Sequence, residues 1–318
     1  MPYPLPPDNP PLQLDEALAS RLHGAQQALS RLDLAGDMEP SIDWFIYAFV
    51  RKEAVLSSQI EGTQATLVDL FSFEAEPDVA PVNADVKDIC NYLDALAFAR
   101  RQLTDPAGLP LTLRLLCDTH HPLMHGVRGA DKQPGEIRCS QNWIGDTRPG
   151  NAAFVPPPPH LLAQALSDFE RYIHSVDTLP ALVRVGLLHV QLETLHPFLD
   201  GNGRVGRLLI TLLLEHWGLL SRPLLYLSLF LKRHRQEYYS RLNAVRREGD
   251  WEGWLAFFLE GVETIASEAS TTARDLFTLV SQDRGIALAR ADVTVLSPRL
   301  LELLPQHPVI TPLTVIKL

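Results

Sequence analysis

Apolar residues recur every three or four positions over most of the chain, which is the spacing of one face of an α-helix. Near the N-terminus this spacing predicts a helix over 12–34, closed by Gly36, and a second from Ser41 to about residue 61, closed by Gly62. It predicts further helices at 83–103, 111–125, 160–174, 181–195, 204–217, 234–247, 251–264 and 291–304. No stretch of about 20–50 residues repeats, which excludes a solenoid. The chain is therefore expected to be mainly α-helical.

One segment, 135–159, departs from the helical pattern. Ile137, Cys139, Gln141 and Trp143 alternate with their neighbours, turn residues follow, and four consecutive prolines close the segment. Alternation followed by turn residues is typical of a β-hairpin. We expect one small β-hairpin here, followed by a proline-rich return.

Changes in composition divide the chain into three parts. Residues 1–36 combine the first helix with a proline-rich arm, which has six prolines in its first eleven residues. Residues 37–270 form the main helical domain, and 271–318 form a C-terminal appendage after a break in composition near 282–285. The appendage resembles the start of a winged-helix module, because 308–312 has the pattern of a helix start with an early proline. A helix-turn-helix reader needs a second helix, so either the appendage is truncated or it serves another purpose, and in neither case do we expect a complete DNA-binding module.

Composition is that of a soluble folded protein, with 46% hydrophobic and 21% charged residues. The longest apolar stretches, such as 208–214, are far shorter than the roughly 18 residues of a membrane span. The N-terminus lacks the basic start and apolar run of a secretory signal. The cysteines Cys90, Cys117 and Cys139 are odd in number and far apart, which favours reduced thiols. We therefore expect a cytoplasmic protein that binds no membrane.

Charge argues against a nucleic-acid partner. The chain has 28 basic and 38 acidic residues, for a formal charge of −10, whereas proteins that bind DNA or RNA usually present a basic surface. An anionic ligand therefore needs a local group of cations and backbone amides.

Residues 196–207 (HPFLDGNGRVGR) supply such a group. Gly201, Asn202 and Gly203 come directly before the helix expected from Arg204, and glycine allows successive amides to converge on an anion. The start of the helix adds free amides and the positive end of its dipole. Arg204 and Arg207 share one face of the first turn, where arginine opposes the dipole. That placement favours a strongly anionic ligand such as a polyphosphate.

Two more side chains in this stretch carry chemistry. Asp200 would repel a phosphate unless a cation lay between them, and Mg²⁺ is the usual one. His196 has a reference pKa of about 6.5, so it can act as a neutral base. A surface turn, a helix cap and a buried histidine explain each residue singly, but the combination indicates a catalytic site.

The stretch resembles the Fic-family signature HPFx[DE]GNGRxxR and matches every fixed position. The hairpin expected at 135–145 resembles the flap of that family, and 238–242 resembles its downstream YYxxL run. The resemblance therefore covers about residues 40–265. It implies a compact helical domain with a β-hairpin flap.

The resemblance implies transfer of AMP from ATP to a protein hydroxyl. In that reaction His196 would deprotonate a Ser, Thr or Tyr hydroxyl, Asp200 would hold Mg²⁺, and Phe198 would pack the loop onto the core. The nucleotide would be held by the loop and helix start, which comprise Gly201, Asn202, Gly203, Arg204, Val205, Gly206 and Arg207. Tyr239 would line the adenosine, although packing in the core explains it equally well.

A second segment, 57–62 (SSQIEG), resembles the inhibitory motif [ST]xxxE[GN] of the same family. Glu61 lies in the last turn of a predicted helix, where its charge is mildly unfavourable and invites a cationic partner. The resemblance implies that Glu61 pairs with Arg207 and misaligns ATP, with Ser57 and Gly62 completing the motif. The same glutamate could position a water molecule that removes AMP from modified targets.

The resemblance also implies a protein partner that carries the acceptor hydroxyl. An extended target segment could add as a strand to the edge at 137–144, or the hairpin could simply cover the pocket. Self-modification and a homodimer are further options.

Four other functions stay open at this stage. A Doc-type kinase is disfavoured by Gly203, because those kinases have a bulky basic residue there. The motif does not exclude phosphocholine transfer. A non-catalytic ATP-sensing regulator is disfavoured by the complete pair of His196 and Asp200, and a DNA-bound regulator by the acidic charge.

Overall fold

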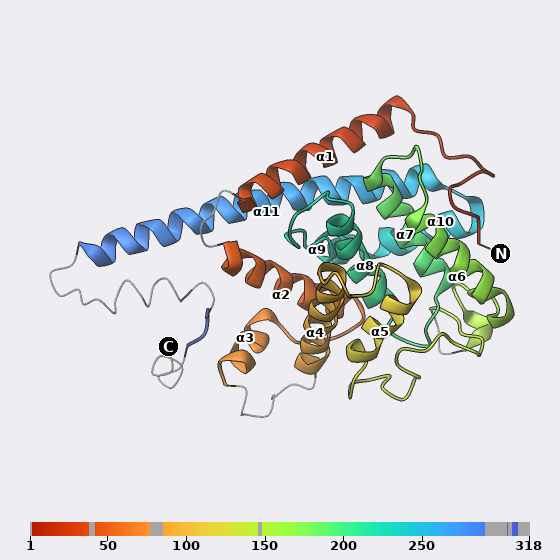
Figure 1. Cartoon of the computed structure of the whole chain (residues 1–318), viewed down its shortest axis with the longest axis horizontal. Coiled ribbons are helices and arrows are strands. Elements are labelled where there is room, and N and C mark those ends of the chain that lie inside the picture. The colour runs from red at the N-terminus through yellow and green to blue at the C-terminus, as the bar shows by residue number, and fades with distance from the viewer. Residues whose placement is uncertain are drawn as a thin grey trace.

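The computed structural model describes residues 2–37, 42–76, 85–145, 148–289, 304 and 307–310. The described chain is mainly helical, as predicted (Figure 1). Its elements are α1 (Glu16–Asp37), α2 (Ile42–Ile60), α3 (Leu67–Ala75), α4 (Asp85–Thr104), α5 (Leu113–Leu123), the 3₁₀ turn η1 (Pro149–Asn151), α6 (Pro159–His174), α7 (Ala181–Leu195), α8 (Asn202–His216), α9 (Ser228–Arg233), α10 (Arg235–Glu248) and α11 (Trp251–Leu288).

Most helices lie within a few residues of their predicted positions, and α7 has the predicted bounds. Helices α3 and α9 were missed because they are too short to show a periodic pattern. A capping box does mark the start of α3, where Thr66 and Asp69 bond to each other's backbone amides. The predicted cap Ser41, the helix at 291–304 apart from residue 304, and the end of the chain after 310 lie outside the described residues.

The β-hairpin predicted at 135–145 is not found in the described residues. The one bridge in this region joins Ile144 to Phe154, with Ile144 N donating to Phe154 O at 2.9 Å. The return segment contains four prolines, which have no N–H to give to a second strand. The alternation at 137–143 therefore reflects an extended segment that is held by side chains instead of by a paired strand.

The C-terminal part also differs from the prediction. Helix α11 runs unbroken to Leu288, through the predicted domain boundary at 270 and the composition break near 282–285. Helix α1 packs along α11, and both lie side by side above the rest of the fold in Figure 1. Small residues such as Ala25 and Ala28 are fully buried in α1 and allow this close approach.

The core is built around α7 and α8, whose residues are buried almost all round. The approach of α11 depends on Gly186 in α7, where a Cβ would lie only 3.0 Å from side-chain atoms of Leu255 and Phe258. Trp254 Nε1 donates to Gly186 O at 2.9 Å across the same contact. Both ends of the loop between α7 and α8 are therefore held by packed helices.

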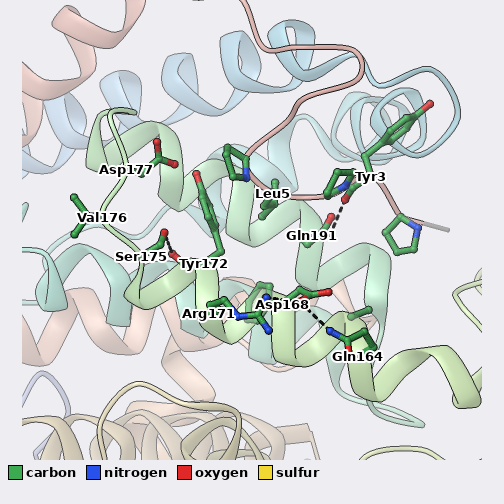
Figure 2. Close-up of a pocket in the computed structure, with 15 residues that line it drawn as sticks. Tyr3, Leu5, Gln164, Asp168, Arg171, Tyr172, Ser175, Val176, Asp177 and Gln191 are labelled. Atoms are coloured by element: carbon green, nitrogen blue, oxygen red, sulfur yellow. Dashed lines mark hydrogen bonds and ion pairs between the residues drawn. The ribbon is translucent and has the colours of Figure 1, made fainter.

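The proline-rich arm lies over α6 and α7 (Figure 2). Gln191 Nε2 donates to Tyr3 O at 3.0 Å, and the Tyr3 ring meets Trp251 edge-on at 6.1 Å. A cavity of about 430 Å³ lies between the arm and α6, and none of the predicted site residues lines it.

No helix in the described part of the chain is both long enough and apolar enough to cross a bilayer. Cys90, Cys117 and Cys139 are free thiols.

We expect Trp254→Ala to lower the free energy of unfolding by about 3–5 kcal/mol, because it empties the centre of the contact between α7 and α11. Urea unfolding followed by circular dichroism measures the change. As a control, Phe277→Ala on the exposed part of α11 should change stability by less than about 0.5 kcal/mol, since Phe277 is 44% exposed. Equal losses in the two variants would contradict this account of the core.

Candidate active site

The end of α7 sets the position of His196. This residue is the C-cap of α7 in the left-handed conformation (φ 48°, ψ 60°), and its N donates to Leu192 O at 2.9 Å. The last carbonyls of a helix lack partners within it, and Arg246 satisfies one by donating from Nη2 to Glu193 O at 2.9 Å. The backbone therefore turns sharply at His196 while the preceding helix stays capped.

Arg138 ties the segment 137–144 to this turn. Its side chain is 2% exposed, Nε donates to His196 O at 2.8 Å, and Nη2 donates to Pro157 O at 2.6 Å. Its own N donates to Pro197 O at 2.9 Å. This arginine connects three backbone segments beside the predicted base, which explains why 137–144 is ordered without a paired strand.

The imidazole of His196 is neutral at ordinary pH. Its Nδ1 is buried and has no hydrogen-bond partner among the described residues. Burial, and then the nearby cation of Arg246, lower the pKa of His196 to about 3. Because Nδ1 is enclosed and the residue is partly exposed, Nε2 is the ring nitrogen through which a neutral imidazole could accept a proton from a ligand.

Asn202 closes the loop between the two helices. Its Oδ1 accepts from Phe198 N at 2.8 Å, and its Nδ2 donates to Phe198 O at 2.8 Å. The Phe198 ring is 1% exposed and stacks on His120 at 3.9 Å, in the packing position expected from the sequence. The side chain of Asn202 is thus engaged within the loop, which leaves its backbone amide as its means of holding an anion.

Gly201 starts α8 in a left-handed conformation (φ 76°), with no side chain capping the helix. A Cβ at this position would lie 2.7 Å from Met124 Sδ, so only glycine fits. Within α8, Val205 N is the first amide to bond back, to Gly201 O at 3.1 Å. The amides of residues 202–204 come before it and are available to an anion, whereas Gly201 N already donates to Asp200 Oδ1 at 2.6 Å.

The Asp200 carboxylate lies beside this helix start. Its Oδ1 accepts from Gly201 N at 2.6 Å, and its Oδ2 lies so close to Gly129 that a Cβ there would come within 2.5 Å of it, which requires a glycine at 129. The described residues contain no group of three side chains that could hold a metal ion by themselves. One carboxylate together with substrate phosphates is a common way to hold Mg²⁺, so Asp200 fits a shared site better than a closed one.

Arg207 is 2% exposed and meets the segment 57–62. Its Nη2 donates to Glu61 Oε1 at 2.6 Å and to Ser57 O at 3.0 Å, and its Nε donates to Ser57 Oγ at 2.9 Å. Burial alone would raise the pKa of Glu61, but the guanidinium holds it below its usual value. The ion pair anticipated between Glu61 and Arg207 is present in this structure.

The chain around Glu61 is held from two sides. Gly62 takes a φ of 102° and turns the chain out of α2, while Arg128 Nη2 donates to Glu61 O at 3.1 Å. Because Glu61 follows the last residue of α2, its carboxylate reaches α8 from a helix end instead of a helix face.

The remaining predicted residues separate into two groups. Arg204 lies near Arg207 but is held by Asp88 Oδ1 at 3.2 Å and Met124 Sδ at 3.1 Å. Gly203 faces Glu61, so a Cβ there would collide with its carboxylate. Arg204 and Gly203 therefore both lie close to the Glu61 carboxylate.

Val205 and Gly206 were also predicted to bind the nucleotide. Val205 is fully buried in the core, and Gly206 faces the side chain of Glu193 and the ring of His189. Tyr239 is half-buried beside Tyr238, with ring centroids 5.2 Å apart. Its position on α10 is compatible with either of the roles considered for it.

Sequence reasoning missed three charged residues around the site, namely Arg138, Glu193 and Arg246. One signal was available, because Glu193 is an acidic residue in a helix that was predicted to be mostly apolar. The contacts of both arginines join segments that are far apart in the chain, so no local pattern marks them.

Two profiles of one protein family match the chain. The profile described as Fic/DOC family N-terminal matches residues 19–101, and the profile described as Fic/DOC family matches residues 110–214. These ranges include Glu61 and the whole of 196–207.

Curated relatives carry the name protein adenylyltransferase Fic. The chain is 31% identical to the protein of Drosophila erecta over 267 residues and 32% identical to that of Culex quinquefasciatus over 266 residues. Each match covers 78% of this chain and 50% of the relative. The chain thus spans about half the length of these relatives.

Solved structures share the fold. A Fic family protein from Desulfovibrio desulfuricans G20 has a TM-score of 0.70 at 19% identity, covering 92% of this chain and 85% of that one. A Fic domain containing signaling protein from Bacteroides thetaiotaomicron has a TM-score of 0.62 at 16% identity, covering 79% and 95%. The profiles, the relatives and the fold agree, and the chain belongs to the Fic/DOC family.

Proposed function

We propose that the chain transfers AMP from ATP to a hydroxyl group of a target protein and releases diphosphate. The observation that carries the proposal is the neutral, unpartnered imidazole of His196, held beside the open amides at the start of α8. The curated relatives are named for this activity, which supports the choice of AMP as the transferred group.

In the proposed reaction His196 accepts the proton of the acceptor hydroxyl. The hydroxyl oxygen then bonds to the α-phosphorus of ATP, and the bond from that phosphorus to the bridging oxygen breaks, so that diphosphate leaves with the electron pair. The polyphosphate charge beside the imidazole would raise the pKa of His196 from about 3 towards the range useful for a base.

The amides before Val205 and the guanidinium of Arg207 would neutralise the phosphates. Asp200 would hold Mg²⁺ through its carboxylate, and the ion would supply charge neutralisation when bound. Gly203 is the residue that favours this reaction over phosphate transfer of the Doc type, because a glycine keeps the helix start open for the leaving diphosphate, whereas those kinases have a bulky basic residue there.

We also propose that Glu61 inhibits the isolated chain. Its carboxylate occupies the guanidinium that would otherwise bind the terminal phosphates. Because Arg207 is buried, its guanidinium can bind either the Glu61 carboxylate or the terminal phosphates of ATP, but not both at once.

The segment 137–144 is the proposed docking site for the target. Arg138 bonds to His196 O, so this segment runs next to the base, and Trp143 keeps 38% of its surface exposed. An extended target bound there would bring its hydroxyl close to the imidazole.

After incubation with ATP and Mg²⁺, we expect Glu61→Gly to gain an AMP-sized mass, on itself or on an added protein, and Glu61→Gly/His196→Ala to gain it about 10²–10⁴-fold more slowly. Intact-mass spectrometry measures both and separates AMP from phosphate or phosphocholine. The control Glu61→Gly/His216→Ala changes an exposed histidine at the end of α8 and should label like Glu61→Gly. Equal labelling with and without His196 would remove it as the base.

The inhibitory contact predicts that Glu61→Gly labels roughly tenfold or more faster than the unchanged chain, because it frees Arg207 for phosphate. Gln59→Gly is a matched control. It weakens the same end of α2, and its side chain bonds to Ala65 O and Lys232 rather than to Arg207. If Gln59→Gly activates as strongly as Glu61→Gly, loosening of the helix and not loss of the ion pair is responsible.

A further inference from the structure

Two glycines of α8 leave room for two carboxylates beside one arginine. A Cβ at Gly203 would collide with Glu61 Oε1 and lie 3.0 Å from Arg207 Nη1. A Cβ at Gly206, the residue directly before Arg207, would lie 2.6 Å from Glu193 Oε1. The absence of a side chain at these two glycines thus leaves space for Glu61 on one side of this helix turn and for Glu193 on another.

The two carboxylates differ in freedom. Glu61 lies just past the end of α2, and its side chain is 34% exposed. Glu193 lies in the last turn of the buried helix α7 and is 6% exposed. Its Oε1 has no hydrogen-bond partner in the part of the chain that the structure describes. Glu61 can leave by rotating outward, whereas Glu193 cannot leave without unfolding α7.

Departure of Glu61 would leave the buried guanidinium of Arg207 with only Ser57 among its present partners. A buried cation that loses its carboxylate is strongly destabilising. Glu53 is also acidic and buried near Arg207, but both of its oxygens bind Ser228. Among the described residues, Glu193 is a further carboxylate whose charge acts on Arg207, and its Oε1 has no hydrogen-bond partner.

We propose that Glu193 is the resident counter-ion of Arg207, a positioning residue that keeps the guanidinium in place after Glu61 has withdrawn. The inference deepens the proposed function, because it names what holds the phosphate-binding arginine in the released state. In the present state Glu61 supplies the negative charge beside the guanidinium, and Glu193 lies against Gly206 with no hydrogen-bond partner for its Oε1 in the described part of the chain.

The electrostatics of the site agree with this exchange. Burial raises the pKa of Glu193 to about 7, Arg207 and Arg246 lower it, and Glu61 raises it. Removal of Glu61 therefore favours the charged form of Glu193. Other titratable side chains nearby are Tyr238 on α10 and His189 on α7, both neutral, since burial raises the pKa of Tyr238 and lowers that of His189 to about 3.

A double-variant cycle of melting temperatures, measured without nucleotide, tests the proposal. Glu61→Gly and Glu193→Gln should each lower the melting temperature modestly, because one carboxylate remains. Together they should cost on the order of 5 °C more than the sum of the single losses. The control pair Glu61→Gly and Glu215→Gln should be additive, because Glu215 pairs with Arg100 elsewhere on α8.

Arg207→Met supplies the second arm. In the Arg207→Met background the guanidinium is absent, so the losses of melting temperature caused by Glu61→Gly and Glu193→Gln should be additive. This arm also covers the case in which the double variant does not fold, because the triple variant should then regain folding. Additive losses with Arg207 present, or an unfolded triple variant, would show that Glu193 serves packing alone and would overturn the proposal.

The cycle also separates this inference from the proposed function. If the double variant loses more melting temperature than the sum of the single variants but Glu61→Gly transfers no AMP, the counter-ion proposal stands and the proposed transfer of AMP is wrong. If the losses are additive and Glu61→Gly does transfer AMP, the proposed function stands and the counter-ion proposal is wrong. In the active case, Glu193→Gln added to Glu61→Gly should raise the KM for ATP about tenfold and change kcat less, since Arg207 binds phosphate in both ground and transition states.

Discussion

The structure depends on a short loop that joins two almost wholly buried helices. Because α7 and α8 are packed on all sides, the six residues between them have little freedom, and the chain must reverse through left-handed positions at His196 and Gly201. Asn202 then closes the loop on Phe198. The proposed base, the proposed metal ligand and the open amides are positioned by this one constraint.

A second constraint is the burial of charge. Arg207, Arg138, Arg204 and Arg246 surround the loop with little or partial exposure to water, and each is held by backbone carbonyls or carboxylates. Such groups are stable only while their partners stay. A buried arginine is therefore suited to regulate ligand binding, because removing or exchanging one of its partners changes which anion the guanidinium can bind.

Taken together, these constraints explain how a helical scaffold can offer a site for a polyanion on an acidic protein. The net charge of −10 is far from what a polyphosphate would favour, yet the helix start concentrates amides and guanidinium groups within a few residues. The cavity beneath the proline-rich arm takes no part in this arrangement, because its lining residues belong to the arm, α6, the loop directly after α6, and α7 (Figure 2).

The sequence by itself determined most of the helices and the chemistry of the loop, because periodic apolar spacing and the glycine, asparagine and arginine order are local properties. It also pointed to Glu61 through a short motif. Tertiary structure decided which charges meet: Glu61 reaches Arg207 across 146 residues, and Arg138 reaches His196 across 58. It also decided that 137–144 is anchored by a side chain and that α11 is continuous. Such pairings depend on how distant helices pack, and no local pattern contains that information.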